Sequence, residues 1–495
     1  MIVLIIACIG VATVLSSILW MKVHPFLALV LGSLVVLGLQ PLTIQEPPDV
    51  TPQPAAIQES LTDPASSTTV VKPAPEYETI TQRLSSAIAD TFKKIGLSIL
   101  MASIVGVCLL ESGAAVRIVQ AIQGTFGGKR TLPALSVSSF ILAIPVYFDT
   151  VFYLLLPLAK AFSKKRGGDY LLSVMAIIVG ATMAHSLVPP TPGPLLVASQ
   201  LGVPIGTMML AGGIVGSIAA ACGYAYGVWC NKHITIDQSL IDEGTANTKS
   251  ELKAEAKIQW EAPPMSFTFA IFPLAVPAFL IAGGEVAKSI FETQIAASPA
   301  WSRVVDTVSD ASFALCIAAA IGLMQLRYQC SRRTDSSKAI STWISKSLSD
   351  GGMILLLTCA GGAFGSSLKQ LGIADAIASH FPAVLTPFGL LWLSFILTAI
   401  IRGAQGSATV AMITTVGVVS PLVQSIELPF NMVYVALAIG CGSKPLAWMN
   451  DSGFWQVCAM TGMTTKQTLQ TFSAALTIMG LVGFAVTLVG AWLIP

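Results

Sequence analysis

Two polar, helix-breaking segments interrupt long apolar stretches of this 495-residue chain. The first, HSLVPPTPGPLL, covers residues 185–196, and the second, GCGSKPLAWMNDSGFW, covers residues 440–455. Proline cannot continue a helix, because it removes a hydrogen-bond donor and collides with the preceding turn. At membrane depth, broken backbone is tolerated only where protein covers it or where it lines a water-filled cavity. The two segments therefore predict a solute site inside a membrane transporter.

The composition supports a membrane protein. Hydrophobic residues make up 54% of the chain and charged residues 11%, against about 25% charged residues in a soluble domain. Successive apolar segments of about 17–25 residues are long enough to cross a bilayer. We expect an all-α polytopic membrane protein with about 10–12 transmembrane helices, multi-pass in the cytoplasmic (inner) membrane. The first apolar run lacks a positive n-region, so we interpret it as a retained helix and not as a signal peptide.

Changes in composition divide the chain into five parts. The Pro/Ser/Thr-rich stretch cannot bury enough apolar area to fold, so we expect an extended or disordered linker there. Loops rich in Lys and Arg are expected inside, and the acidic linker is then expected outside. This arrangement leaves Lys22 inside and predicts that the N-terminus lies outside. The parts are an N-terminal transmembrane helix pair (1–40), the linker (41–84), a first transport repeat (85–229), a polar, cytoplasmic loop (230–264) and a second transport repeat (265–495).

The two halves of the chain resemble each other. Residues 106–122 align with 361–377 at an offset of 255, and residues 180–203 align with 440–463 at an offset of 260. Both matches occur in the same order at nearly the same offset. Secondary carriers are commonly built from inverted repeats with paired broken helices, and the substrate lies at the repeat interface. We therefore predict two inverted repeats with broken helices and re-entrant hairpins.

Ionisable residues in apolar spans are costly, and they are typical of a transport pathway or of a buried pair. Glu111 and Asp149 each interrupt an apolar run, although either could instead lie at a helix end near the membrane surface. His185 precedes the first break and could be a core histidine. Arg402 could extend to the lipid headgroups or pair with a buried carboxylate. Lys444, in the second break, could equally mark the edge of a loop.

Two further polar runs point to a binding site. Asn450 and Asp451 lie in a turn-prone N-D-S-G sequence between aromatic residues, which favours a substrate or ion site. The run QGSATVAMIT, residues 405–414, is typical of a helix start whose free N–H groups can receive an anion. Its small residues could instead serve close helix packing.

Four ordered motifs resemble the gluconate permease (GntP) family of sugar-acid/proton symporters. They are IPVYFDTVFYLLLPLAKAF, HSLVPPTPGPL, AQGSATVAMIT and the NDSGFW run. The resemblance extends from about residue 85 to the C-terminus. The chain departs from the family pattern at Ala447 and Trp448, where a Ser-His pair is typical, at Lys444, where an apolar residue is usual, and in the insert 41–78.

The residues and the resemblance together give a set of candidate site residues. The expected proton-coupling residues are Glu111, Asp149 and Asp451. The expected substrate-binding residues are Ser112, His185, Thr191, Gly193, Arg402, Gln405, Ser407, Thr409, Asn450 and Ser452.

The resemblance implies proton-coupled uptake of gluconate or a related small hydroxylated organic acid. A sodium-coupled carrier or an anion exchanger for small carboxylates on the same scaffold is the main alternative, and a channel is a weaker one. No HExxH, G-x-S-x-G or Walker A motif indicates an enzyme. The scattered cysteines and four histidines predict no metal or cofactor. The expected partners are the organic anion, the proton and the lipid bilayer, without nucleic acid, and a homo-oligomer is left open.

Overall fold

The structure, a computed structural model, is built from helices, and its described residues contain no strand. It describes residues 1–40, 79–126, 131–166, 168–234, 236, 265–291, 298–330, 336–373, 376, 386–423 and 426–494. The first half holds α1 (Ile2–Leu19), α2 (Pro25–Leu39), α3 (Ile80–Glu111), α4 (Ala114–Phe126), α5 (Thr131–Leu142), α6 (Phe148–Arg166), α7 (Tyr170–Leu187), α8 (Pro192–Leu201) and α9 (Ile205–His233). The second half holds α12 (Phe267–Ile290), α14 (Pro299–Ser309), α15 (Ala311–Cys330), α16 (Ser336–Gln370), α18 (Pro387–Gln405), α19 (Ala408–Val423), α20 (Val433–Gly442), α21 (Ser452–Thr461), α22 (Thr465–Thr468), η3 (Leu469–Ser473) and α23 (Ala474–Leu493).

Eight helices of the described part of the chain are long and apolar enough to cross a membrane, and five shorter apolar helices accompany them. The expected number was about 10–12. The difference arises because several apolar stretches are split into short helices, among them α5, α19 and α20. The prediction of an all-α polytopic protein is confirmed.

Two helices, α3 and α9, extend into the ranges 41–84 and 230–264, which were predicted to be a linker and a polar loop. The helix α3 begins at Ile80, where the Thr79 hydroxyl accepts from the Gln82 N–H and the Gln82 side chain accepts from the Thr79 N–H. Its first five residues therefore belong to the range 41–84. The helix α9 continues to His233, four residues into the range 230–264. Residues 41–78 and 237–264 lie outside the described residues.

The helix bounds repeat along the chain. The helices α8 and α21 begin at Pro192 and Ser452, 260 residues apart. The helices α3 and α16 end at Glu111 and Gln370, 259 residues apart. The predicted offset of 260 around the two breaks is thus confirmed. The offset of 255 for the earlier segments is wrong by about one helical turn, a slip that keeps apolar residues on the same helix face.

Glycines with positive φ end the same four helices. Gly113 (φ 76°) and Gly372 (φ 75°) follow α3 and α16, and Gly202 (φ 68°) and Gly462 (φ 75°) follow α8 and α21. Glycine adopts this left-handed conformation without a Cβ clash, so it closes a helix and lets the chain turn. Each repeat therefore has its chain reversals at equivalent positions.

The long helices α3 and α16 cross at the centre of the repeat. A Cβ at Gly362 would lie 2.1 Å from Thr91 Oγ1, and one at Gly351 would lie 2.5 Å from Ser103 Oγ. Residue numbers rise along one helix and fall along the other, so the helices run antiparallel. Thr91 is equivalent to Gly351, 260 positions away, and Ser103 is equivalent to Gly362, 259 positions away. Exchanging equivalent residues therefore turns one contact into the other, as expected for a two-fold axis. That axis is perpendicular to two membrane-spanning helices, so the repeats are inverted.

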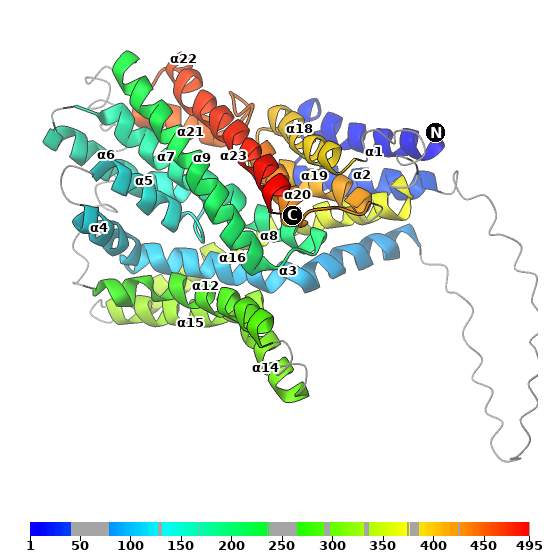
Figure 1. Ribbon diagram of the computed structural model, residues 1–495, viewed down its shortest axis with the longest axis horizontal. Helices are drawn as coiled ribbons and strands as arrows, with labels where there is room; N and C mark the ends of the chain where they lie inside the picture. The colour runs from blue at the N-terminus through cyan, green and yellow to red at the C-terminus, as the bar shows by residue number, and fades with distance from the viewer. Residues whose placement is uncertain are drawn as a thin grey trace, which may run out of the picture.

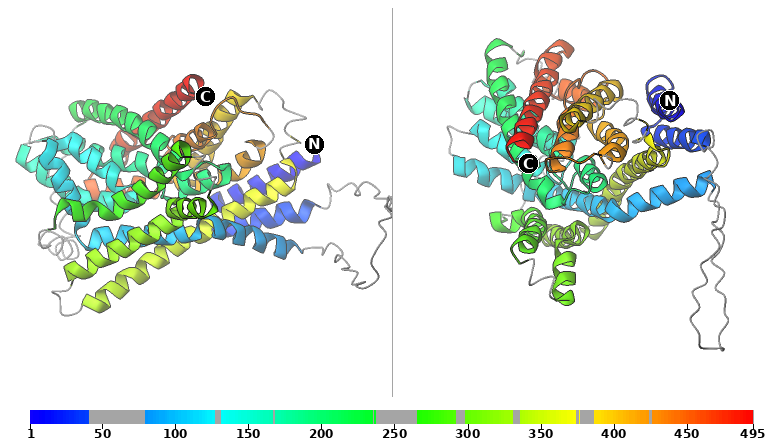
Figure 2. Two further views of the ribbon diagram at one scale, coloured as in Figure 1. Left: turned by 60° about the horizontal axis from the view of Figure 1, so that its bottom comes forward. Right: turned by 45° about the vertical axis from the view of Figure 1, so that its right-hand side comes forward.

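Each outer helix pair packs onto the long helix of the other repeat. The helix α2 of the pair α1–α2 packs on α16, and α15 of the pair α12–α15 packs on α3. Figures 1 and 2 show the two pairs at opposite ends of the long helices. A Cβ at Gly32 of α2 would lie 3.1 Å from Phe364 Cε2, and one at Gly322 of α15 would lie 3.0 Å from Cys108 Cβ. Small residues thus allow equivalent close approaches in both repeats.

The neighbouring glycines of α16 provide a test of this crossing. We expect Gly351→Leu to destabilise the protein, because its side chain would collide with Ser103, and overpacking typically costs about 1–3 kcal/mol. Gly352→Leu is the matched control, since nothing lies within 4 Å of a Cβ there. Thermal unfolding of the purified protein in detergent should show a lower melting temperature for the first variant only. Equal melting temperatures would contradict the described crossing.

Candidate functional site

A cavity of about 450 Å³ lies where the broken helices meet. Its walls combine residues of α6, α7 and α8 with residues of α16, α18, α19, α21, η3 and α23. Four pairs of lining residues are equivalent in the two repeats, 260 positions apart: Tyr147 and Ser407, Phe148 and Ala408, Asp149 and Thr409, and Pro192 and Ser452. The cavity is therefore the interface between the repeats. Its size falls in the range of about 300–1,000 Å³ usual for small-molecule sites.

Four helices begin at this cavity. The first residues of α6, α8, α19 and α21 are Phe148, Pro192, Ala408 and Ser452, and all four line the wall. The helical backbone is interrupted before each of them, at residues 143–147, at the prolines of the first break, at Gly406 (φ 78°) and at the second break. The N–H groups of a first helical turn lack partners within the helix and carry partial positive charge. Their convergence favours an anionic ligand.

A buried ion pair joins the end of α18 to the start of α21. Arg402 near the end of α18 donates to the Asp451 carboxylate and to the Gly406 carbonyl. The other Asp451 oxygen accepts from the Gly453 N–H at 2.7 Å and caps α21. The side chains of the pair are only 5% and 6% exposed. Arg402 thus pairs with a buried carboxylate, one of the two alternatives that the sequence left open.

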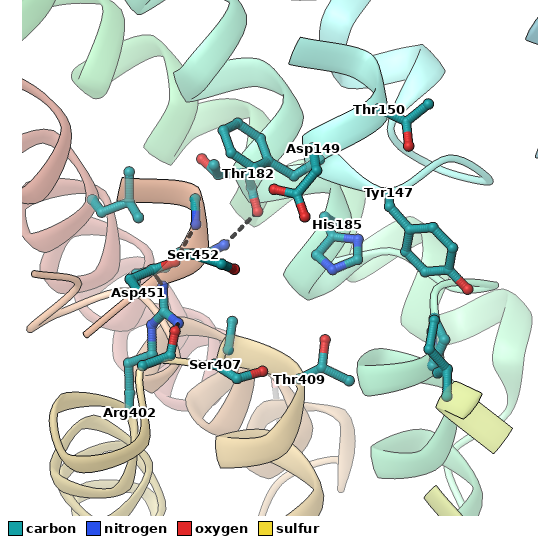
Figure 3. Close-up of a pocket in the computed structure, with 18 of the residues that line it drawn as sticks. Tyr147, Asp149, Thr150, Thr182, His185, Arg402, Ser407, Thr409, Asp451 and Ser452 are labelled. Carbon is teal, nitrogen blue, oxygen red and sulfur yellow. Dashed lines mark hydrogen bonds and ion pairs between the residues drawn. The ribbon is translucent and has the colours of Figure 1, made fainter. Parts of the chain in front are cut away.

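Asp149 presents its carboxylate to the cavity from the first turn of α6 (Figure 3). Its backbone carbonyl accepts from Gln456 Nε2 at 2.9 Å, but no described residue forms a hydrogen bond or an ion pair with its carboxylate. Figure 3 shows Ser407 and Thr409 across the cavity from it. Asp149 is therefore a carboxylate whose charge the surrounding described side chains do not neutralise.

His185 lies on a helix that is otherwise enclosed. Every other residue of α7 is buried, as expected for a helix that is apolar all round. His185 lines the cavity, and its ring packs edge-on against Tyr147 with centroids 6.0 Å apart. Its Nδ1 is buried and has no hydrogen-bond partner among the described residues. A ligand hydroxyl or water could bond there.

Seven of the thirteen predicted site residues line the cavity and six do not. The seven are Asp149, His185, Arg402, Ser407, Thr409, Asp451 and Ser452. The six outside the lining are Glu111, Ser112, Thr191, Gly193, Gln405 and Asn450.

Three of the six serve the turns and the packing around the breaks. Thr191 donates to the carbonyls of His185 and Val188 at 2.9 and 2.8 Å, so its hydroxyl closes the end of α7. Gly193 allows close packing, since a Cβ there would lie 2.2 Å from Met412 Cε. Asn450 donates to the Gly403 carbonyl at 2.7 Å and holds the end of α18.

The other three lie at two helix ends. Glu111 and Ser112 form the turn from α3 to α4, where the Ser112 hydroxyl accepts from the Ala114 N–H at 3.3 Å. Gln405 ends α18, and its amide oxygen and nitrogen are buried without partners among the described residues. None of these side chains reaches the cavity wall.

Five polar residues line the cavity although the sequence did not assign them to the site: Tyr147, Thr150, Thr182, Asp350 and Lys444. Tyr147 could have been found by applying the offset of 260 to Ser407. Lys444 lies in the second break itself, where a lysine beside a proline also fits a loop edge. Asp350 and Thr182 carry no comparable signal, because which face of a long helix meets a cavity depends on the tertiary packing.

A cavity at the interface of two inverted repeats, lined by the ends of broken helices, is typical of secondary transporters. The sequence matches the GntP family permease model over residues 69–493, and the chain belongs to this family. It is 29% identical to a gluconate permease of Pseudomonas aeruginosa, covering 82% of this chain and 86% of that one. It is 27% identical to the inner membrane permease YgbN of Escherichia coli, covering 97% of each chain.

A solved structure has a similar fold. The Alcanivorax borkumensis YdaH transporter, described as having an unusual topology, matches with a TM-score of 0.55 and 16% sequence identity. The match covers 94% of this chain and 98% of that one. Together with the eight long apolar helices, the family confirms a multi-pass membrane protein, and the relatives are named as permeases and not as enzymes.

The buried ion pair gives a stability prediction. We expect Asp451→Asn to lower the free energy of unfolding by about 3–5 kcal/mol, because it leaves the Arg402 charge buried and uncompensated. Adding Arg402→Met to Asp451→Asn should recover part of the loss, since the double variant has no buried charge at this point. Melting temperatures of the purified proteins in detergent measure both effects.

An exposed pair provides the control for this experiment. Lys288 Nζ and Asp306 Oδ1 lie 3.0 Å apart on the surface, where ion pairs contribute little. Asp306→Asn should leave the melting temperature unchanged. If Asp451→Asn melts like the Asp306 variant, the Arg402–Asp451 pair does not hold the two helix ends together.

Proposed function

We propose that the protein is a secondary active transporter that takes up gluconate, or a related small hydroxylated organic acid, together with protons across the cytoplasmic membrane. The observation that carries this proposal is the convergence of four helix N-termini on one cavity between the repeats. Such N-termini attract a carboxylate. Relatives over most of the chain are named gluconate permeases.

The lining of the cavity suits a substrate with several hydroxyl groups and one carboxylate. Ser407, Thr409 and Ser452 offer hydroxyls that can both donate and accept, and His185 offers a ring nitrogen. These neutral groups stand beside the helix N-termini. A sugar acid could therefore place its hydroxyls on side chains and its carboxylate in the positive part of the wall.

Asp149 is the residue we assign to proton coupling. Two like charges 4 Å apart repel by about 4 kcal/mol at an effective dielectric constant of about 20. An ionised Asp149 would thus oppose a substrate carboxylate in the same cavity, whereas a protonated Asp149 removes the repulsion and gains a donor. Asp451 is less suited to this task because Arg402 already neutralises it. Glu111 does not line the cavity.

A co-transported proton also addresses the membrane potential. Moving one negative charge toward a negative interior costs about 2.3 kcal/mol per 100 mV. A proton that enters with each monocarboxylate cancels that charge. The pH gradient then adds to the driving force.

Uptake by reconstituted protein tests the proposal. Proteoliposomes should accumulate labelled gluconate or another sugar acid when a pH gradient, acid outside, is imposed at fixed sodium. Accumulation that follows a sodium gradient at constant pH, or uptake only in exchange for an internal anion, would favour the alternative carriers. Flux that never exceeds equilibrium would indicate a channel.

Asp149→Asn gives the residue-level prediction. We expect it to abolish accumulation driven by pH and to retain counterflow of labelled substrate, because the amide keeps the shape and most hydrogen bonds of the carboxyl group. Glu111→Gln is the matched control and should retain accumulation, since Glu111 lies outside the cavity lining. Full accumulation by the Asp149 variant would show that another group carries the proton.

A further inference from the structure

Lys444 is a buried cation without a carboxylate partner. It lies just after α20, is 2% exposed and lines the cavity. Its Nζ donates to the Thr182 carbonyl of α7, which leaves two of the three ammonium N–H groups for other acceptors. No described carboxylate lies within 4.0 Å of it.

Arg402, the second cation of the cavity, already has a counter-ion in Asp451. Arg402 is engaged by the Asp451 carboxylate and by the Gly406 carbonyl, on the side of α18 and α21. Lys444 therefore remains as the cavity cation that no carboxylate of the described residues pairs with. A buried charge without a counter-ion is unfavourable, so this position favours an anion from outside the chain.

The rest of the lining limits how many anionic groups can be held. The other charged residues that line the cavity are Asp149 and Asp350, both acidic. A second carboxylate on the same ligand would meet these groups and not a free cation. The arrangement therefore favours a ligand with one carboxylate and a neutral, hydroxylated remainder.

We propose that Lys444 binds the substrate carboxylate and thereby selects monocarboxylates over dicarboxylates and neutral polyols. The inference rests on the proposed function, whose substrate class it narrows. In this arrangement the carboxylate accepts from the free N–H groups of Lys444. The hydroxylated part of the substrate extends toward Ser407 and Thr409, and the Thr182 carbonyl holds the lysine side chain in place.

Three ligands with the same carbon skeleton separate these possibilities. Gluconate carries one carboxylate, glucarate carries two, and gluconamide replaces the carboxylate by a neutral amide. Binding is measured as the ligand-induced rise in melting temperature of the purified full-length protein, and transport as competition with labelled gluconate in proteoliposomes. For the wild type we expect gluconate to bind at least about tenfold more tightly than the other two, in line with a charge-assisted hydrogen bond.

Lys444→Gln should remove this preference. The glutamine amide can still donate to the Thr182 carbonyl, so the variant is expected to fold, while gluconate and gluconamide should bind within about twofold of each other because the discriminating charge is gone. Lys444→Arg keeps the charge and should retain the preference for gluconate. Lys466→Gln, an exposed lysine outside the cavity, is the matched control and should behave as the wild type.

The two readouts distinguish failure of this inference from failure of the proposed function. If Lys444→Gln keeps the tenfold preference for gluconate over gluconamide, the inference is overturned, although proton-driven uptake by the wild type would still stand. If the wild type binds gluconate in a Lys444-dependent manner without accumulating it, the proposed transport is overturned and the carboxylate assignment stands. Equal binding of gluconate and glucarate by the wild type would also overturn the monocarboxylate selection.

Discussion

Helices that begin inside an apolar core leave N–H groups without partners, and this constraint organises the whole molecule. Four such helix starts lie at one cavity. Two means of satisfying them are visible in the structure. Asp451 caps α21 and pairs with Arg402 of α18, so one carboxylate serves a helix start and a buried cation together. In the first turn of α19, the Ser407 hydroxyl accepts from the Val410 N–H at 3.4 Å.

The repeats are alike in backbone and different in chemistry at the cavity. Thr191 and Asp451 are the N-cap residues of equivalent helices, but only the aspartate brings a charge, and with it the need for Arg402. Asp149 and Thr409 likewise occupy the second position of equivalent helices. The two-fold architecture thus supplies paired helix ends, while the different side chains at equivalent positions make the two sides of the cavity chemically different. A single substrate orientation requires such inequality.

Sequence reasoning located the breaks, the inverted repeat and seven of the residues that line the cavity, because prolines and charges are costly in apolar spans and their positions carry information. It could not decide which way a side chain points within a break. Thr191 and Asn450 are as polar as Ser452, yet their side chains bond to backbone carbonyls and do not line the cavity. The partner of Arg402 lies 49 residues away in the chain, so the pairing depends on the tertiary fold. The predicted offset of 255 differs from the observed 259 by about one helical turn, because a shift of one turn keeps the apolar residues on the same helix face.

The proposed residues also suggest why substrate and proton would move together. Arg402 and Asp451 form a neutral pair, and the other charged residues of the cavity lining are Lys444, Asp149 and Asp350. A monocarboxylate on Lys444 adds one negative charge, and a proton on Asp149 removes one, so the loaded and empty cavities carry the same net charge. Binding either alone would leave an unbalanced charge in a region of low dielectric constant, where it is most unfavourable. On the proposed assignment, coupling is therefore a consequence of charge balance between two side chains, without any direct bond between substrate and proton.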